Sequence, residues 1–349
     1  MRATSPAAFD ESTVIEASGL RREFRQYRRF PGMWGALRGL FTREHTLVRA
    51  VDGIDFSVQR GEAVGYLGQN GAGKSTTIKM LCGILMPTAG HLRVLGRIPH
   101  KARRENARRF GAVFGQRSQL WWDLPLTDSF DLHRLMYHVP SPRFRENVAH
   151  YTKLLDLTRF LDRPVRQLSL GERMRAELAI ALLHDPEIVF LDEPTIGLDV
   201  IAKDAIREAL RTVNRERGVT LIVTSHDLQD IEHLCPRIVL IHAGRLVFNG
   251  TLAELKARLG RQRRIKLTFA DDPGDVNFAG ARLERRDGRV LHFVFERGAI
   301  SPIDVLAALP QREQVIDLSI EEPGIEQVLR TFYRGLSSPV SESAQETPR

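Results

Sequence analysis

The chain has 349 residues, a hydrophobic content of 42% and a formal net charge of +8. This composition excludes wholesale disorder, and the length fits two domains. No apolar run approaches the roughly 18 residues of a membrane-spanning helix, and the first residues lack the apolar core of a signal peptide, so we expect a cytosolic protein. The positive charge is compatible with nucleic acid, anionic lipid or an acidic partner and does not select among them.

Residues 1–12 read as a disordered tail, and a strand is expected from Val14 to about Phe24. A basic amphipathic insert follows at about 25–46, where aromatic and aliphatic side chains recur at helical spacing among many arginines. Such a helix packs on its own domain, or it docks on a membrane subunit or on the membrane surface. The sequence leaves these alternatives open.

A glycine-rich loop carries the clearest functional signal. The apolar run 62–67 reads as a buried strand and 77–82 as the start of a helix, and the segment between them matches G-x4-G-K-[ST]. In this context backbone N–H groups and a helix N-terminus surround phosphates, Lys74 reaches the β- and γ-phosphates, and Ser75 binds Mg²⁺. The expected phosphate-binding residues are Gly68, Gln69, Asn70, Gly71, Ala72, Gly73, Lys74, Ser75 and Thr76. The sequence therefore predicts binding of a nucleoside triphosphate.

Strands and helices alternate through the first 258 residues. Further short apolar strands are expected at 91–96, 110–114, 188–191, 220–224 and 238–241. The interval from about 117 to 170 is polar with helical spacing, and it reads as an inserted helical subdomain. This alternation indicates an α/β fold in which helices connect the strands of one sheet.

Composition changes after residue 258. The strands expected there are 265–269, 281–285, 290–296 and 315–320, and the helices lie near 303–308 and 324–333. These elements predict a small α+β domain over 259–336. The Ser-, Glu- and Pro-rich residues 337–349 are expected to be disordered.

Polar side chains follow several of the expected strands. Asp192 and Glu193 come directly after a strand of four apolar residues. Asp192 is thereby placed to organise Mg²⁺, and Glu193 to orient or deprotonate an attacking water. Gln116 and His226 follow other strands, and the carboxyl ends of parallel strands converge on one crevice. A strand-end histidine is also a common structural hydrogen-bonding group, so two roles remain for His226.

Six motifs stand in the order found in one family. They are Gly68–Thr76, Gln116, Leu168–Glu172, Leu191–Pro194, Gly197–Asp199 and His226. Together they resemble the ATP-binding subunits of ABC transporters over about residues 14–257. The resemblance implies an ABC ATPase with the α/β fold of P-loop NTPases over residues 13–258. It also implies ATP and Mg²⁺ as ligands and a head-to-tail homodimer with two ATP molecules between the protomers.

The resemblance implies a catalytic set and a metal site. Glu193 would be the catalytic base, His226 the switch histidine and Gln116 the glutamine of the Q-loop. Mg²⁺ would be bound by Ser75, Gln116 and Asp192. All of these side chains would then meet around the γ-phosphate of ATP.

Other implied roles concern the second protomer. Ser169 and Gly171 of the signature segment would face the ATP held by the other chain, and Asp199 would lie in the D-loop. The signature differs from the family's usual Leu-Ser-Gly-Gly-Gln at Leu170 and Glu172.

Aromatic residues have two further implied roles. Phe24 is expected to stack on adenine, and the alternatives for this position are Tyr27 and Phe30. The pair Trp121–Trp122, just after Gln116, lies where family members contact a membrane subunit. Packing inside the domain is the other interpretation of these two tryptophans.

The segment from Glu321 to Val328 is similar to the Glu-Pro-x-Leu-Glu-x-x-Phe ending of ATPases from drug and polysaccharide exporters. This likeness implies the motor subunit of a bacterial exporter, held at the cytoplasmic side of the inner membrane by a separate polytopic permease and without a nucleic acid partner. The alternatives are an ABC ATPase that acts on nucleic acid or ribosomes, and the ATPase of an importer.

Overall fold

The computed structural model describes residues 12–27, 45–114, 118–225, 228–259, 262–274, 276, 280–296, 304 and 314–321. The chain divides into two compact units, residues 1–250 and 251–349. The expected features outside the described residues are Gln116, His226, Phe30, most of the insert at 25–46, the helices near 303–308 and 324–333, the exporter-like ending and nearly all of both tails. Within the described part, no helix is long and apolar enough to cross a bilayer.

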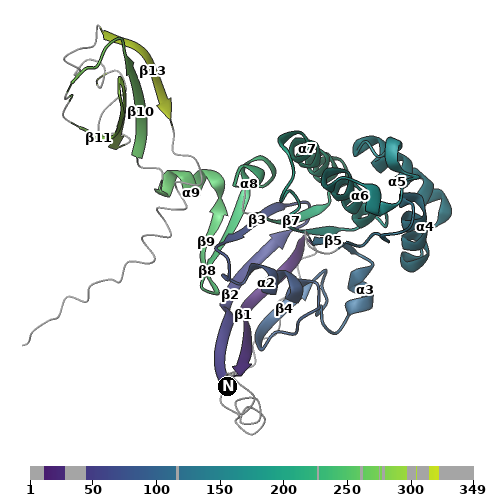
Figure 1. Cartoon of the computed structure of the whole chain (residues 1–349). Coiled ribbons are helices and arrows are strands. Elements are labelled where there is room, and N and C mark those ends of the chain that lie inside the picture. Colours follow the sequence, from purple (N-terminus) through teal and green to yellow (C-terminus); the bar gives the residue numbers. More distant parts are fainter. Residues whose placement is uncertain are drawn as a thin grey trace, which may run out of the picture. The chain divides into compact units, whose positions relative to one another are not determined.

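A six-stranded sheet with the order β5-β6-β7-β3-β8-β9 forms the centre of the first unit (Figure 1). Its strands are β3 (Ala63–Gly68), β5 (Phe110–Phe114), β6 (Ile188–Asp192), β7 (Thr220–Thr224), β8 (Arg237–His242) and β9 (Arg245–Thr251). Neighbouring strands from β5 to β8 are parallel. Because β3, β7 and β6 are adjacent, their carboxyl ends lie side by side. The α/β class predicted from the alternation is confirmed, and β9 is an addition to the expected strands.

Helices connect the strands of this sheet. They are α2 (Lys74–Leu81), α3 (Arg103–Ala107), α4 (Leu126–Tyr137), α5 (Ser141–Leu154), α6 (Leu170–Leu182), α7 (Val200–Arg217) and α8 (Leu228–Leu234). α6 packs on β5, and its residues 176–182 are all buried. α4 and α5 contact α6 and occupy the interval in which a helical subdomain was expected. The signature segment at the start of α6 is therefore carried by a helix that joins this helical part to the sheet.

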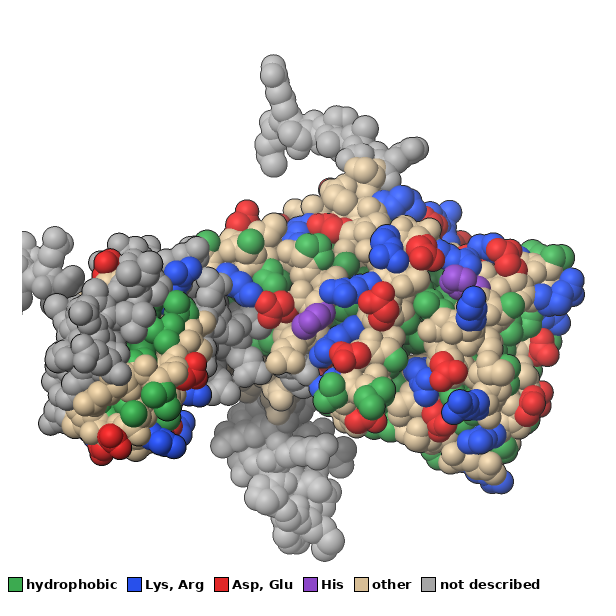
Figure 2. All heavy atoms as spheres, turned by 90° about the horizontal axis from the view of Figure 1, so that it is seen from above, with side chains coloured by type: hydrophobic (Ala, Val, Ile, Leu, Met, Phe, Trp, Pro, Cys, Tyr) green, Lys and Arg blue, Asp and Glu red, His purple; other side chains and the backbone are tan. Residues whose placement is uncertain are grey.

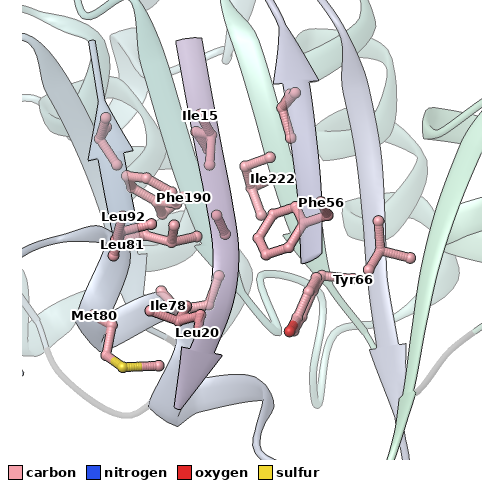
Figure 3. Close-up of a cluster of buried hydrophobic side chains, with 14 of the residues drawn as sticks. Ile15, Leu20, Phe56, Tyr66, Ile78, Met80, Leu81, Leu92, Phe190 and Ile222 are labelled. Carbon is pink, nitrogen blue, oxygen red and sulfur yellow. The ribbon is translucent and has the colours of Figure 1, made fainter. Parts of the chain in front are cut away.

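A three-stranded antiparallel sheet packs on α2, on the side opposite the parallel sheet. It consists of β1 (Thr13–Tyr27), β2 (His45–Gln59) and β4 (Ala89–Val94) in the order β2-β1-β4. Figure 3 shows the core between the sheets, in which Phe56 of the smaller sheet lies beside Tyr66 of β3, and Ile15 of β1 belongs to the same cluster as Leu81 of α2 and Phe190 of β6. Each of these buried side chains contributes roughly 1.5–3 kcal/mol to stability. This core fixes α2, and with it the glycine-rich loop, against the parallel sheet.

The second unit begins with α9 (Leu252–Leu259) and contains an antiparallel sheet with the order β11-β12-β10-β13. Its strands are β10 (Gln262–Phe269), β11 (Ala281–Asp287), β12 (Val290–Glu296) and β13 (Val315–Glu321). Alternate residues of β10 and β12 are buried in one cluster, made by Ile265, Leu267, Phe269, Leu291, Phe293 and Phe295 together with Val276. Because buried and exposed residues alternate along β10 and β12, these strands could be predicted from the sequence. The helix α9 was not expected.

Two histidines connect α4 to β5 in the first unit. His184 Nε2 lies 3.1 Å from the Phe110 carbonyl oxygen, and His184 Nδ1 lies 3.1 Å from His133 Nε2. A carbonyl oxygen only accepts, so His184 Nε2 carries the hydrogen and His133 Nε2–H donates to His184 Nδ1. Burial lowers the pKa of His133 to about 3 and that of His184 to about 4. Both rings are therefore neutral at neutral pH.

Acid should destabilise the protein through this histidine pair. Below the ordinary pKa of 6.5 both histidines bind protons in the unfolded chain. In the folded protein they stay neutral until the pH reaches 3 to 4. The stability that comes from the two neutral histidines is complete above pH 6.5. As the pH falls from 6.5 toward the folded-state pKa values, each histidine lowers the free energy of unfolding by about 1.4 kcal/mol per pH unit. Denaturant unfolding of His133→Asn between pH 7 and about 4 should show a shallower pH slope than the unsubstituted protein. The exposed His91→Asn serves as the control, and equal slopes in all three proteins would rule out this origin of acid sensitivity.

Candidate nucleotide-binding and catalytic site

The glycine-rich loop leaves the carboxyl end of β3 and leads into α2. Gly71 (φ 81°) and Gly73 (φ 107°) have left-handed backbone conformations, which residues with side chains rarely adopt. A Cβ atom at Gly73 would lie 2.2 Å from the carbonyl oxygen of Ala50, and one at Gly68 would lie 2.6 Å from that of Ile241. The loop is thus pressed against backbone of β2 and β8, and glycine is required at both of these close approaches.

Lys74, the first residue of α2, is 7% exposed. Its Nζ donates to the carbonyl oxygens of Gly68 at 2.7 Å and Gln69 at 3.3 Å. Burial lowers the pKa of Lys74, and the negative charges of Glu193 and Asp192 act in the opposite direction. The ammonium group therefore lies inside the loop and within the field of the two acids, as its predicted role requires.

Asp192, the last residue of β6, is held by hydroxyl groups on two sides. Ser75 Oγ donates to Asp192 Oδ2 at 3.2 Å, and Thr224 Oγ1 donates to Asp192 Oδ1 at 2.6 Å. Asp192 and Thr224 are direct partners in the pairing of β6 with β7. The structure thereby brings Ser75 and Asp192 together, two of the three residues expected to bind Mg²⁺. Gln116, the third, lies outside the described residues.

Glu193 follows at a point where the backbone turns sharply. Its φ of 58° is left-handed, which costs a residue with a side chain about 1–3 kcal/mol and is common at functional sites. Its N–H is held by β7, with the Thr224 carbonyl oxygen at 3.0 Å and Thr224 Oγ1 at 3.2 Å. The surrounding contacts therefore keep Glu193 in this conformation, at the end of β6 beside Asp192.

The signature segment starts α6 with a capping box. Ser169 is the N-cap, its Oγ accepts from the Glu172 N–H at 3.3 Å, and the Glu172 carboxylate accepts from the Ser169 N–H at 2.8 Å. The backbone hydrogen bond from Ser169 lowers the pKa of Glu172. Glu172, a departure from the family's usual glutamine, thus closes the first turn of the helix. The S-x-x-E spacing is a known sequence signal for this cap and could have predicted it.

The expected D-loop, at Gly197–Asp199, packs directly on the signature segment. Asp199 is the N-cap of α7, and its Oδ1 accepts from the Ala202 N–H at 2.8 Å. A Cβ at Gly171 would lie 3.2 Å from the Ala202 Cβ, and a Cβ at Gly197 would lie 3.1 Å from Leu170 Cδ2. Leu170, the other departure, therefore covers Gly197 of the D-loop. The N-termini of α6 and α7 form one surface that contains Gly171 and Asp199.

Glu177 is a buried acid that sequence reasoning missed. It lies on α6, and its carboxylate accepts from Ser118 Oγ and from the Gln119 N–H at 3.1 Å. Burial raises the pKa of Glu177, although these donors partly oppose that shift. The carboxylate ties α6 to the segment just after the expected Q-loop, which leads into Trp121 and Trp122. An acid inside an apolar helix repeat was the available sequence signal.

The expected adenine-stacking residue lies on the strand pair that contacts the loop. Phe24 of β1 pairs with Val48 of β2, its ring is partly exposed, and the Arg22 guanidinium carbon lies 4.7 Å from the ring centroid. β2 continues to Ala50, whose carbonyl oxygen closely approaches the loop. Stacking on adenine stays a prediction for Phe24. Tyr27, one alternative, is the last residue of β1.

Taken together, the glycine-rich loop, the buried lysine and the Ser75–Asp192 pair at the end of neighbouring parallel strands define a P-loop nucleoside triphosphatase. The ABC transporter family profile matches residues 51–196. The linearmycin resistance ATP-binding protein LnrL of Bacillus subtilis is 34% identical over 63% of this chain and 70% of its own length. The chain therefore belongs to the family of ABC transporter ATP-binding proteins.

Two further comparisons agree with this family. The probable multidrug ABC transporter ATP-binding protein YbhF of Escherichia coli is 37% identical over 70% of this chain, and the match spans 38% of YbhF. A solved structure of an ATP-binding subunit of an ABC transporter covers 71% of this chain and 94% of its own, with 25% identity and a TM-score of 0.58. The predicted ABC ATPase class and its P-loop NTPase fold are confirmed.

Proposed function

We propose that the chain is the ATP-hydrolysing motor subunit of a bacterial exporter, bound to a separate polytopic permease at the cytoplasmic side of the inner membrane. The observation that carries the proposal is the placement of Ser75, Asp192 and Glu193 together beside the glycine-rich loop. The direction of transport is supported by the names of two relatives, a multidrug protein and a linearmycin resistance protein. ATP-driven closure and hydrolysis-driven opening would then act on the permease.

The residues at the loop fit a magnesium ion. A serine hydroxyl and a carboxylate oxygen within 3.2 Å of each other form the hard oxygen donor set that Mg²⁺ prefers. Mg²⁺, when bound by Ser75 and Asp192 with Gln116, neutralises charge on the phosphate oxygens. Lys74 and the loop N–H groups bind the phosphates, and Glu193 orients the water and accepts its proton. His226 is proposed to contact the γ-phosphate from the next strand.

A head-to-tail homodimer is proposed from the apolar side chains around the signature and the D-loop. Leu170, Ile196, Val200 and Ile201 are between 40% and 84% exposed. They lie beside Ser169 and Asp199, which the family resemblance places against the second protomer. Apolar side chains gathered at one place on a surface are typical of protein interfaces. The second protomer would thus cover this patch and place Ser169 and Gly171 on its ATP.

The tryptophan pair is proposed as part of the permease contact. Trp121 and Trp122 are 38% and 51% exposed, which argues against the alternative of packing inside the domain. The Arg173 guanidinium of α6 lies 5.6 Å from the Trp122 ring centroid, and the Trp121 N–H donates to Ser129 Oγ of α4 at 3.2 Å. The rings are therefore presented by a firmly held segment, as a docking site requires.

Co-purification from native membranes tests this function. Tagged Glu193→Gln protein, captured from gently solubilised membranes with Mg-ATP present, should bring down a multi-spanning protein. Adding Trp121→Ala and Trp122→Ala should reduce its recovery, because the docking side chains are removed. The exposed Ile316→Ala of the second unit is the control and should leave recovery unchanged. Recovery of soluble protein alone, or of nucleic acid, would refute the transport role and leave the ATPase chemistry intact.

The charge pattern on the described part of the surface argues against the nucleic acid alternative. Figure 2 shows lysine and arginine side chains interspersed with aspartate and glutamate over the described part of that face. Many arginines are paired, such as Arg60 with Glu187 at 2.6 Å and Arg237 with Glu62 at 2.9 Å. Nucleic acid binding proteins instead gather unpaired cationic side chains on one face.

A further inference from the structure

A buried carboxylate behind the site binds three segments of the chain. Asp230 of α8 is 1% exposed, and its Oδ2 accepts from Thr195 Oγ1 and from Ser225 Oγ at 3.1 Å. Its Oδ1 accepts from Arg207 of α7, with Nε at 2.7 Å and a second bond from Nη2. Arg207, Thr195 and Ser225 are themselves at most 9% exposed.

Each of these segments leads to a part of the hydrolytic machinery. Thr195 is two residues after Glu193, and Ser225 follows Thr224, which holds both Asp192 and the Glu193 backbone. Arg207 is part of the helix that Asp199 caps. One carboxylate therefore connects the ends of β6 and β7 with the helix of the D-loop.

The charge of Asp230 is what makes this connection strong. An ionised carboxylate accepts several hydrogen bonds at once, and bonds to a charged partner are about twice as strong as neutral ones. An amide at the same place would have one accepting oxygen and would turn its N–H₂ group toward one of these donors. Loss of the charge would also remove the buried partner of Arg207, whose other ion pair, with Asp204 at 2.9 Å, is to a carboxylate that is 64% exposed.

We propose that Asp230 is a positioning residue for ATP hydrolysis, which holds Glu193 after β6 and Ser225 after β7 in the geometry that the reaction requires. It acts through Thr195, Ser225 and Arg207 and does not contact the nucleotide itself. The left-handed conformation of Glu193 needs such support, because a strained residue keeps its place only when its surroundings fix it. This role depends on the ATPase reaction and not on export.

The first test is steady-state hydrolysis by full-length Asp230→Asn. Its kcat should fall roughly 10- to 100-fold, as expected when a reacting group is displaced by about 1 Å. Its Kd for Mg-ATP should stay within about twofold, because the glycine-rich loop and Lys74 are untouched. The matched control is Asp204→Asn, which removes the exposed partner of the same arginine and should retain kcat. An unchanged kcat in Asp230→Asn would overturn the proposal.

A double variant separates positioning from stability. Asp230→Leu combined with Arg207→Met replaces both buried ions by apolar side chains, and such exchanges are often neutral or stabilising. The melting temperature should then recover relative to Asp230→Asn, whereas kcat should stay low because Thr195 and Ser225 have lost their acceptor. Recovery of kcat together with the melting temperature would show a merely structural role and overturn the proposal.

The milder variant Thr195→Val covers the case in which Asp230→Asn fails to fold. It removes one donor to the carboxylate and no charge, so it should lower kcat severalfold with an unchanged Kd for Mg-ATP. A kcat equal to that of the unsubstituted protein would count against the proposal in the same way. Hydrolysis by the unsubstituted protein is measured beside each variant, so loss of the ATPase assignment itself would be seen separately.

Discussion

Glu193→Gln should lose nearly all ATP hydrolysis and keep ATP binding. The amide has the shape of the carboxylate but cannot accept the proton of the attacking water, and a general base of this kind contributes about 10²- to 10⁴-fold to the rate. Lys74, Ser75 and the loop are unchanged, so the Kd for Mg-ATP should move by less than about threefold. Phosphate release at saturating Mg-ATP gives kcat, and equilibrium titration with a fluorescent ATP analogue gives Kd.

The control for this substitution is Glu208→Gln on α7. Its carboxylate is 65% exposed and lies 3.7 Å from Arg211, so its removal should change neither kcat nor Kd beyond error. Undiminished hydrolysis by Glu193→Gln would remove Glu193 from the role of catalytic base. A variant that lost ATP binding together with turnover would assign the residue to binding instead.

Gly73→Ala should abolish nucleotide binding. The added methyl group would lie 2.2 Å from the Ala50 carbonyl oxygen, and the backbone at φ 107° is already unsuited to alanine. Either the loop or β2 has to move, and the N–H groups that point into the loop move with it. The Kd for Mg-ATP should therefore rise at least about 100-fold, which corresponds to roughly 2.8 kcal/mol.

Gly71→Ala is the matched control within the same loop. Gly71 also has a left-handed backbone, with φ 81°, but nothing lies within 4 Å of its Cβ position. The cost there is conformational, about 1–2 kcal/mol, so binding should weaken far less than in Gly73→Ala. Equal losses in the two variants would show that backbone strain, and not the contact with Ala50, sets the requirement for glycine.

The local parts of the site were readable from the sequence because each is a short motif on one element. The loop after β3 and the acids after β6 follow runs of buried apolar residues, and parallel strands bring their ends together. The meeting of Ser75 with Asp192 at 3.2 Å is the result of that arrangement. The loop and the acids could therefore be predicted from short local patterns, and the fold class from the alternation of strands and helices along the first 258 residues.

The supporting contacts could not be predicted in this way. Asp230 binds side chains that are 35 and 23 residues away in sequence, and Glu177 binds one that is 59 residues away. Local spacing can mark such an acid as buried, as it does for Glu177 among the apolar residues of α6, but it does not show which distant side chains the carboxylate binds. β9 was missed for a different reason, since its three apolar residues are consecutive and show no alternation. The sequence did hold signals for α9, namely leucines at 252, 255 and 259 and the Thr251–Glu254 capping pair.

The hydrogen bond between Ser118 and Glu177 joins the first turns of α6 to the segment before the tryptophan pair. Between Ser169 and Glu177 the helix rises about 12 Å, at 1.5 Å per residue, and it carries the segment before the tryptophan pair at one end and the signature at the other. With the proposed permease contact at Trp121 and Trp122, a displacement there would reach Ser169 through the Glu177–Ser118 hydrogen bond and the packed turns of α6.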